Sequence, residues 1–159
     1  MPVRVNRKDL LIISNLRTNA RESLTNLSKK VDMPISTIFD RLRMHEGTLI
    51  KRHTSLIDFN QLGYFARAHI VLKVRKDDRD IAREHLNKSL CVNSVYKINN
   101  NYDFLVEGIF RNVKELEDFV EDLEERFTTQ DIQVYYIIED IKQEGFMADP
   151  RMLDLIMQE

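Results

Sequence analysis

The sequence predicts an α+β protein in which three short helices are followed by a ferredoxin-like domain of order β-α-β-β-α-β. Apolar residues recur at helical spacing through the first 50 residues, whereas apolar and polar residues alternate from residue 64 onward. The charge also changes: residues 1–60 hold 11 Lys and Arg against 6 Asp and Glu, and residues 61–159 hold 13 against 20. We therefore expect a basic domain over 1–50, a linker over 51–63, a second domain over 64–145 and a tail over 146–159.

Residues 21–50 predict two helices joined by a tight turn. Their apolar residues keep helical spacing on both sides of Asp32-Met33-Pro34, with Leu24, Leu27 and Val31 before it and Ile35, Ile38 and Leu42 after it. Pro34 disfavours helical geometry at Met33, so that one helix ends there and the next begins with Pro34 in its first turn. An earlier helix over 7–18, capped by Asn6, completes a winged-type helix-turn-helix domain that we expect to bind DNA.

The outer face of the last of these helices carries the hydroxyl, acidic and guanidinium groups that read a DNA major groove. The predicted DNA-binding residues on it are Ser36, Thr37, Phe39, Asp40, Arg41 and Arg43. The arginines suit phosphate or guanine, and the hydroxyls suit bases or phosphates. Phe39 either touches a thymine methyl or packs against the first helix, and Asp40 either accepts from a cytosine amino group or pairs with Arg43.

Basic residues on both sides of this helix are predicted phosphate contacts. They are Lys29 and Lys30 at the end of the preceding helix, and Lys51 and Arg52 beyond it. The alternative for each is a solvated surface position. Residues 50–57 are β-branched and partly alternating, so they predict a strand that leaves the first domain, and residues 58–63 predict a hinge.

The second domain alternates strand and helix patterns. Strands are expected over 64–75, 92–99, 102–110 and 131–141, and amphipathic helices over 77–90 and 112–127. In this order both helices cover one face of a four-stranded antiparallel sheet. The strands offer apolar residues to the other face as well, which predicts a dimer formed sheet to sheet. Residues 152–156 either form a short helix that docks on a neighbouring molecule or belong to a loosely held end.

A polar turn in the second domain is the candidate effector site. Its residues are Asn100, Asn101, Tyr102 and Asp103, beside the expected dimer face. A plain hairpin turn followed by a strand explains the same residues equally well.

Several classes of protein are disfavoured by the composition. The four glycines do not form a dinucleotide-binding or phosphate-binding loop, the four histidines lack metal-ligand spacing, and Cys91 is the one cysteine. We therefore expect no enzyme, no cofactor and no metal site. No apolar run approaches the roughly 20 residues that span a bilayer, and the first residues contain no apolar signal-peptide core, so a cytoplasmic location without membrane contact is expected.

The chain resembles the Lrp/AsnC (feast/famine) transcription regulators over roughly residues 7–145. Asp9, Ile12, Ile13 and Leu16, then Asn19-Ala20-Arg21 and Leu27-Ser28-Lys29-Lys30-Val31, are similar to the DNA-binding domain of that family. The tract from Ile50 to Asp58 with Leu62-Gly63 is similar to its linker strand, and Tyr102-Asp103 after a turn resembles its ligand-sensing domain.

The resemblance implies a homodimer or an octamer that binds pseudo-palindromic DNA, and a small effector, commonly an amino acid, held between sensing domains. This chain departs from the family pattern at Pro34, where a capping serine is usual, in the shortened segment from His45 to Ile50, and at Asn100-Asn101, where a glycine and an acid are usual. We expect a sequence-specific DNA-binding transcriptional regulator. The alternative is a small-molecule-binding interaction module that has lost specific DNA binding.

Overall fold

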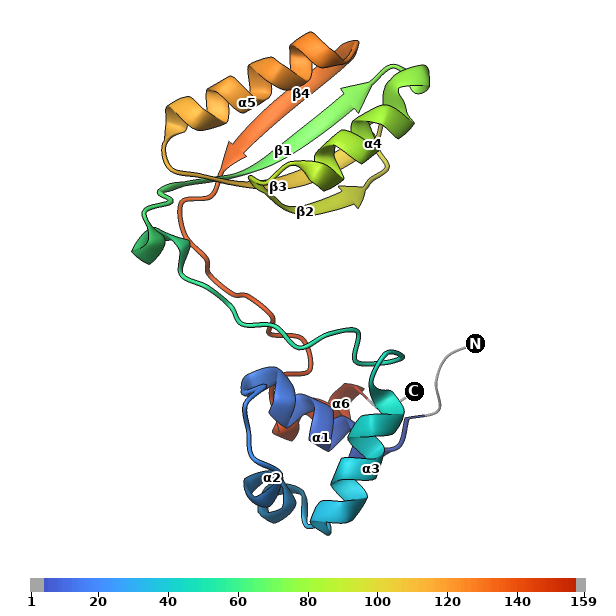
Figure 1. The fold of residues 1–159 in the computed structure, drawn as a ribbon. Helices are drawn as coiled ribbons and strands as arrows, with labels where there is room; N and C mark the ends of the chain where they lie inside the picture. Colours follow the sequence, from blue (N-terminus) through green and yellow to red (C-terminus); the bar gives the residue numbers. More distant parts are fainter. Residues whose placement is uncertain (1–4, 157–159) are drawn as a thin grey trace. The chain divides into compact units, whose positions relative to one another are not determined.

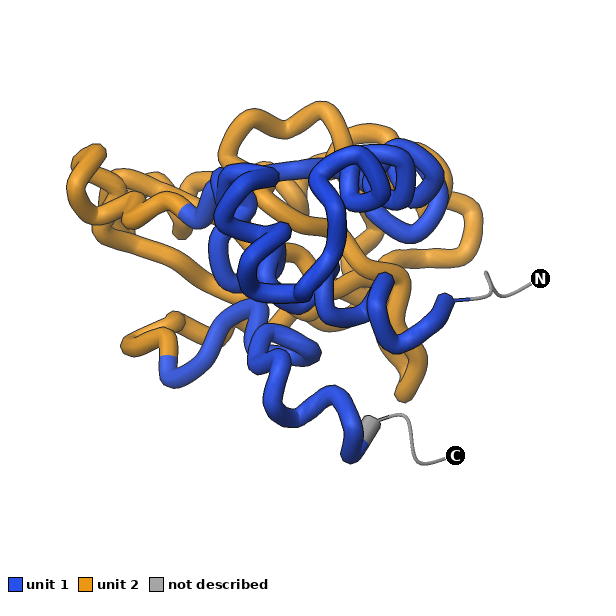
Figure 2. The backbone as a smooth tube through the Cα atoms, turned by 90° about the horizontal axis from the view of Figure 1, so that it is seen from below, with its two compact units in different colours: residues 1–56, 141–159 blue, residues 57–140 orange. Residues whose placement is uncertain are grey.

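The computed structural model describes residues 5–156 (Figure 1). The chain divides into two compact units, which are coloured separately in Figure 2. The head unit contains the residues up to Leu56 together with those from Ile141 onward, and the sheet unit contains Ile57–Asp140. The head unit is therefore made of two segments, separated in sequence by the whole of the sheet unit.

Three helices, α1 (Arg7–Thr18), α2 (Leu24–Val31) and α3 (Ile35–His45), form the first segment of the head unit. Asn6 caps α1 in a capping box: its side chain accepts from Asp9 N at 2.9 Å, and Asp9 Oδ2 accepts from Asn6 N at 3.0 Å. Ser23 caps α2. α3 begins one residue later than expected, because Pro34 occupies the N-cap position and not the first turn. The core between the three helices contains Ile12, Leu27, Val31, Met33 and Ile38.

The second segment of the head unit packs along α1. The short helices η3 (Pro150–Met152) and α6 (Leu153–Ile156) lie against α1, and Leu153 is fully buried. Ion pairs join both ends of α1 to this segment, Arg7 with Asp154 at 2.8 Å and Arg17 with Glu144 at 2.7 Å. The helix expected near residues 152–156 thus forms, and its partner is the head unit of the same chain. Residues 157–159 of the expected tail lie outside the described residues.

The buried carboxylate of Asp9 joins α1 to α3. The residue is 2% exposed, and its Oδ1 atom lies 2.5 Å from Arg41 Nη1 and 3.4 Å from His45 Nε2. Burial acts to raise the pKa of Asp9, but the hydrogen bonds from Asn6 N and Arg41 and the approach of His45 outweigh it, so that the pKa lies below its ordinary value of 3.8. Asp9 is therefore a carboxylate at neutral pH, and it anchors α3 to the first turn of α1.

The strand expected over residues 50–57 does not form. The wing is reduced to a tight turn closed by a bridge between Glu46 and Ile50, and residues 51–58 are exposed and unpaired with any strand. A strand needs a neighbouring backbone to exchange hydrogen bonds with, and residues 51–57 make no backbone hydrogen bond to another part of the described chain. The hinge takes the form of η1 (Phe59–Leu62), which ends at Gly63 with a φ of 85°.

The sheet unit has the expected ferredoxin-like order, with its strands arranged β2-β3-β1-β4 and all pairs antiparallel. The strands are β1 (Ala66–Val74), β2 (Val92–Lys97), β3 (Phe104–Phe110) and β4 (Thr129–Tyr136). The helices are η2 (Lys76–Asp78), α4 (Arg79–Lys88) and α5 (Val113–Arg126), and Figure 1 shows α4 and α5 on one face of the sheet. β4 ends five residues before the expected residue 141, because only Ile137 N finds a further acceptor, Arg67 O.

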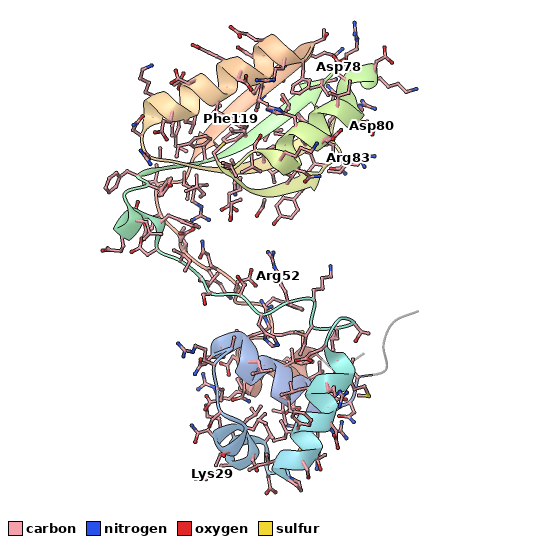
Figure 3. The ribbon with its side chains drawn as sticks, in the orientation of Figure 1. Lys29, Arg52, Asp78, Asp80, Arg83 and Phe119 are labelled. Carbon is pink, nitrogen blue, oxygen red and sulfur yellow. The ribbon has the colours of Figure 1, made fainter. Side chains whose placement is uncertain are left out.

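The larger core lies between the sheet and these two helices. Alternate residues of β1 are buried throughout, as the sequence pattern predicted. α5 contributes Leu116 and Leu123, and Phe119 (labelled in Figure 3) stands against Phe110 with 5.5 Å between ring centroids. The buried stripe of α4 is Ala82 and Leu86. Ile81 and Leu90, which share the helical spacing in the sequence, are exposed.

The opposite face of the sheet is more polar than expected. Val71, Leu105 and Ile109 lie on it, but charged and hydroxyl groups stand on both sides of them. Ile138 and Ile141, which were expected on the last strand, lie beyond β4 and are 97% and 93% exposed. This face of the sheet is therefore a mixture of apolar and polar side chains.

Leu153→Ala should destabilise the head unit by about 2–5 kcal/mol, because it removes a fully buried side chain and leaves a cavity against α1. Urea unfolding followed by circular dichroism measures this loss. Leu155→Ala is the matched control, since Leu155 is 63% exposed in the same helix and should change the free energy of unfolding by no more than about 0.5 kcal/mol. Equal effects of the two variants would contradict the docking of α6.

The head unit should also lose stability in acid through Asp9. Because the folded pKa of Asp9 is depressed, its contribution is present above the unfolded pKa, about 3.9, and is lost as the pH falls through the folded pKa, below 3.8. Urea midpoints between pH 6 and pH 3 should fall more steeply for the wild type than for Asp9→Asn. Asp40→Asn, an exposed change in the same unit, should keep the wild-type slope. Parallel curves for the wild type and Asp9→Asn would refute this role of Asp9.

Candidate functional site

The outer face of α3 carries a polar stripe of Ser36, Asp40 and Arg43, spaced at i, i+4 and i+7. All three residues are exposed, and Thr37 beside them is half-buried. Among the described residues Asp40 and Arg43 do not form the ion pair that was the alternative interpretation of Asp40. Both side chains are therefore directed to solvent, where a nucleic acid has access to them.

Phe39 is 51% exposed, and it is not part of the core between the three helices. The alternative in which it packs against the first helix is thus not what the structure contains. Ile35, one turn earlier, is 45% exposed. The polar stripe is therefore bordered by two apolar side chains.

Arg41 does not join the polar stripe. Its guanidinium lies against Asp9 and donates to Asn6 Oδ1 at 3.3 Å, and its side chain is 27% exposed. The sequence contains a signal for this contact: Asp9 stands three residues before Ile12 and seven before Leu16, on the apolar stripe of α1. An acid on a buried stripe calls for a buried cation.

The flanking basic residues surround α3 without forming a single cluster. Lys30 pairs with Glu22 at 2.7 Å, whereas Lys29, Lys51 and Arg52 form no ion pair within residues 5–156. Figure 3 places Lys29 on α2 and Arg52 on the segment that follows α3. Lys51 and Arg52 line a half-open groove of about 620 Å³ in the head unit, together with Leu16, Arg21 and Leu56.

The first turn of α3 also lacks a side-chain cap, because the side chain of Pro34 at the N-cap position contains no hydrogen-bond acceptor. Its N–H groups and the hydroxyls of Ser36 and Thr37 are thus at the end of the helix that favours negative charge. This end of α3 suits a phosphate oxygen.

The four predicted effector residues separate into two groups. Asn100 and Asn101 form the hairpin turn with φ of 60° and 72°, and Asn101 Oδ1 accepts from Lys73 Nζ on the open face of the sheet. Asp103 is buried on the other side, where it accepts from Val74 N at 3.1 Å and pairs with Arg79 at 2.6 Å. Asp103 therefore fastens β1 to α4 and does not join the other three.

Tyr102 belongs to a row of hydrogen-bonded side chains on the open face. Tyr135 donates to Gln133, Gln133 Nε2 donates to the Tyr102 hydroxyl at 2.5 Å, and that hydroxyl donates to Asp131 Oδ2 at 2.6 Å. The hydrogen bond to Asp131, with burial, raises the pKa of Tyr102, so the phenol keeps its proton. We call this row the tyrosine relay.

A second polar cluster on the same face was not anticipated from the sequence. Glu107 is 9% exposed and accepts from Arg67 Nε at 2.8 Å, Asn93 Nδ2 at 2.7 Å and Ser94 Oγ at 3.0 Å. Burial acts to raise the pKa of Glu107, but these hydrogen bonds outweigh it and lower the pKa below its ordinary value. Arg67 also pairs with Asp140 at 2.7 Å. In the sequence these residues show no motif, because most of them are ordinary polar positions of the predicted strands.

Nothing in the part of the chain that the structure describes resembles a catalytic or metal centre. No three His, Cys, Asp or Glu side chains in residues 5–156 are arranged to hold a metal ion. Cys91 is half-buried, and burial raises the pKa of its thiol, which disfavours a nucleophilic thiolate. Within the same residues, none of the helices is both long and apolar enough to cross a membrane.

Comparison with known proteins relates the whole arrangement to helix-turn-helix regulators. No protein-family model matches the chain. The HTH-type transcriptional regulator FL11 of Pyrococcus horikoshii is 31% identical over 122 residues, which are 76% of this chain and 81% of FL11. A further HTH-type transcriptional regulator, from Pyrococcus abyssi, is 27% identical over 144 residues, 86% of this chain and 93% of its own length.

Solved structures share the fold along most of the chain. A transcriptional regulator of Neisseria meningitidis, crystallised with L-methionine, superimposes with a TM-score of 0.81 at 23% identity, covering 88% of this chain and 94% of its own. LrpC of Bacillus subtilis gives 0.81 at 20% identity, with 89% and 99% covered. AsnC of Escherichia coli gives 0.77 at 19% identity, with 89% and 97% covered.

The three-helix head, the β-α-β-β-α-β sheet unit and the similarity to FL11 lead to one conclusion. The chain is a transcriptional regulator and not an enzyme, and it belongs to the Lrp/AsnC family of helix-turn-helix regulators.

Proposed function

We propose that this regulator binds specific DNA sequences as a dimer or higher oligomer, and that a small effector modulates the binding. The exposed stripe of Ser36, Asp40 and Arg43 on α3 carries the proposal, because it offers donors and an acceptor that have no partner among residues 5–156. The basic balance of residues 1–60 supports attraction to a polyanion. The same basic balance argues against the alternative, an interaction module without specific DNA binding.

The proposed contacts differ in role. Arg43 contacts guanine or phosphate, and Ser36 and Thr37 contact bases or a phosphate at the N-terminus of α3. Lys29, Lys30, Lys51 and Arg52 are proposed to contact phosphates, with Lys30 exchanging Glu22 for the DNA backbone. Arg41 contributes through its hold on Asp9, which keeps α3 in place. A DNA contact by Arg41 would use the guanidinium nitrogens other than Nη1, which donates to Asn6 and Asp9.

Arg43→Ala should weaken binding to a selected DNA site several-fold and reduce the salt dependence of the affinity by about one unit of slope, because a cation no longer displaces counterions. Electrophoretic mobility shift or fluorescence anisotropy at several salt concentrations measures both quantities. Arg83→Ala is the matched control: Arg83 is an exposed arginine of α4 that pairs with Asp80 (Figure 3). Unchanged affinity and slope for Arg43→Ala would remove Arg43 from the interface.

The open face of the sheet is the proposed dimer interface. Val71, Leu105 and Ile109 form its apolar centre, and the tyrosine relay and the Glu107 cluster satisfy their polar groups internally, which lowers the cost of burying them. A two-fold dimer presents two copies of α3 to half-sites about 10–10.5 base pairs apart, or a multiple of that spacing. An octamer built from such dimers is the proposed higher assembly.

Val71→Asp should weaken this dimer on the order of a hundredfold or more, because it buries an unpaired carboxylate at the interface. Analytical ultracentrifugation at micromolar concentration should show a dimer or larger species for the wild type and a monomer for the variant. Leu90→Asp, at a fully exposed position after α4, should behave as the wild type does. A wild-type monomer, or a Val71→Asp dimer, would rule out this interface.

The proposed effector is a small amphipathic molecule such as an amino acid, held beside the turn of Asn100 and Asn101 and the tyrosine relay. The hydroxyl, amide and carboxylate groups there recognise an ammonium and a carboxylate group. The structural neighbour from Neisseria meningitidis is a complex with L-methionine, which supports this class of ligand. Equilibrium dialysis against the twenty amino acids tests it, and binding that Tyr102→Phe leaves unchanged would place the site elsewhere.

A further inference from the structure

Two apolar side chains on α3 have no part in the phosphate and hydrogen-bond contacts proposed above. Ile35 and Phe39 are 45% and 51% exposed and stand one helical turn apart, at i and i+4. They border the polar stripe on the face that carries Ser36, Asp40 and Arg43. The core between α1, α2 and α3 is complete without either of them. Both side chains are therefore available for contact with a partner outside the head unit.

The chemistry of the major groove limits what these side chains recognise. Phenyl and sec-butyl groups neither donate nor accept hydrogen bonds, and the one apolar group on a major-groove base edge is the C5-methyl of thymine. We propose that Phe39, supported by Ile35, reads thymine methyl groups in each half-site. This inference rests on the proposed function, since it assigns base preference to the same DNA-binding helix.

The charged groups of α3 point to the same preference. A guanine edge presents two acceptors and is read by arginine, but Arg41 is held at Asp9 and Asn6, which leaves Arg43 as the arginine on the outer face of α3. Asp40, beside Phe39, has no ion-pair partner among the described residues and repels the acceptors of guanine. The middle of α3 thus combines an apolar contact, which suits the thymine methyl, with a carboxylate, which suits the amino group of the paired adenine and disfavours guanine.

A second copy of the chain is the other conceivable partner for Ile35 and Phe39. A stable protein interface buries on the order of 800 Å² on each partner, far more than two half-exposed side chains offer. The neighbouring Ser36, Asp40 and Arg43 are polar and uncovered. The patch is therefore too small for a stable dimer and fits a contact with single methyl groups.

Replacement of thymine by deoxyuridine tests the proposal, because it removes the methyl group and keeps base pairing and the O4 acceptor. A binding site is first obtained by selection from random duplex DNA, and each thymine is then replaced singly. Burial of one methyl is worth roughly a fourfold change in affinity. We expect one or two positions in each half-site where deoxyuridine weakens binding by about that factor, measured by fluorescence anisotropy with the full-length protein.

Variants then assign the effect to its residues. Phe39→Ala should bind the thymine and deoxyuridine duplexes equally at the sensitive position, and Ile35→Ala should reduce the difference. Ile81→Ala, which truncates an exposed apolar residue of α4, should keep the wild-type ratio. Circular dichroism melting of each variant checks that the fold is retained.

Each outcome separates this inference from the proposal that it deepens. Failure to select any duplex would refute specific DNA binding, and the base preference with it. Specific binding that is indifferent to deoxyuridine at every position would overturn the thymine contact alone. A thymine preference that survives in Phe39→Ala would overturn its assignment to Phe39.

Discussion

The contact between Asp9 and Arg41 determines how α3 is oriented in the head unit. A carboxylate that is 2% exposed must have a cation and hydrogen-bond donors. α3 supplies the cation, and the N-cap residue of α1, Asn6, supplies a backbone donor. Because Asp9 is also part of the capping box, one side chain sets where α1 begins and where α3 lies against it. The orientation of α3 then decides which of its side chains reach solvent.

The sheet unit also contains buried acids that hold polar groups of neighbouring elements in place. Asp103 fastens β1 to α4 through Val74 N and Arg79, and Glu107 gathers Arg67, Asn93 and Ser94 on the opposite face. Each acid consumes polar groups that appear free in the sequence. Outside these clusters, Arg43 in the head unit has no ion-pair partner among the described residues, whereas the tyrosine relay forms its hydrogen bonds within the sheet.

Much of the fold was predictable because it depends on local patterns. The cap at Asn6, the alternation of β1 and the amphipathic helix α5 are properties of short stretches, and the structure confirms them. The prediction of a strand over 50–57 was wrong, because a strand depends on pairing with a second strand, which composition does not reveal. The placements of Arg41 and Asp103 depended on partners 32 and 24 residues away, so residue type alone grouped them with the exposed candidates.

The two-segment construction of the head unit has a consequence for the order in which the protein folds during synthesis. Domains fold as units as the chain is made from its N-terminus. The sheet unit is continuous and has all of its core once Asp140 has been added. The head unit, although α1 is made first, lacks Leu153 and the ion-pair partners of Arg7 and Arg17 until the residues after the sheet unit emerge from the ribosome. The helix-turn-helix unit of this regulator is thus the first to be translated and the last to be completed.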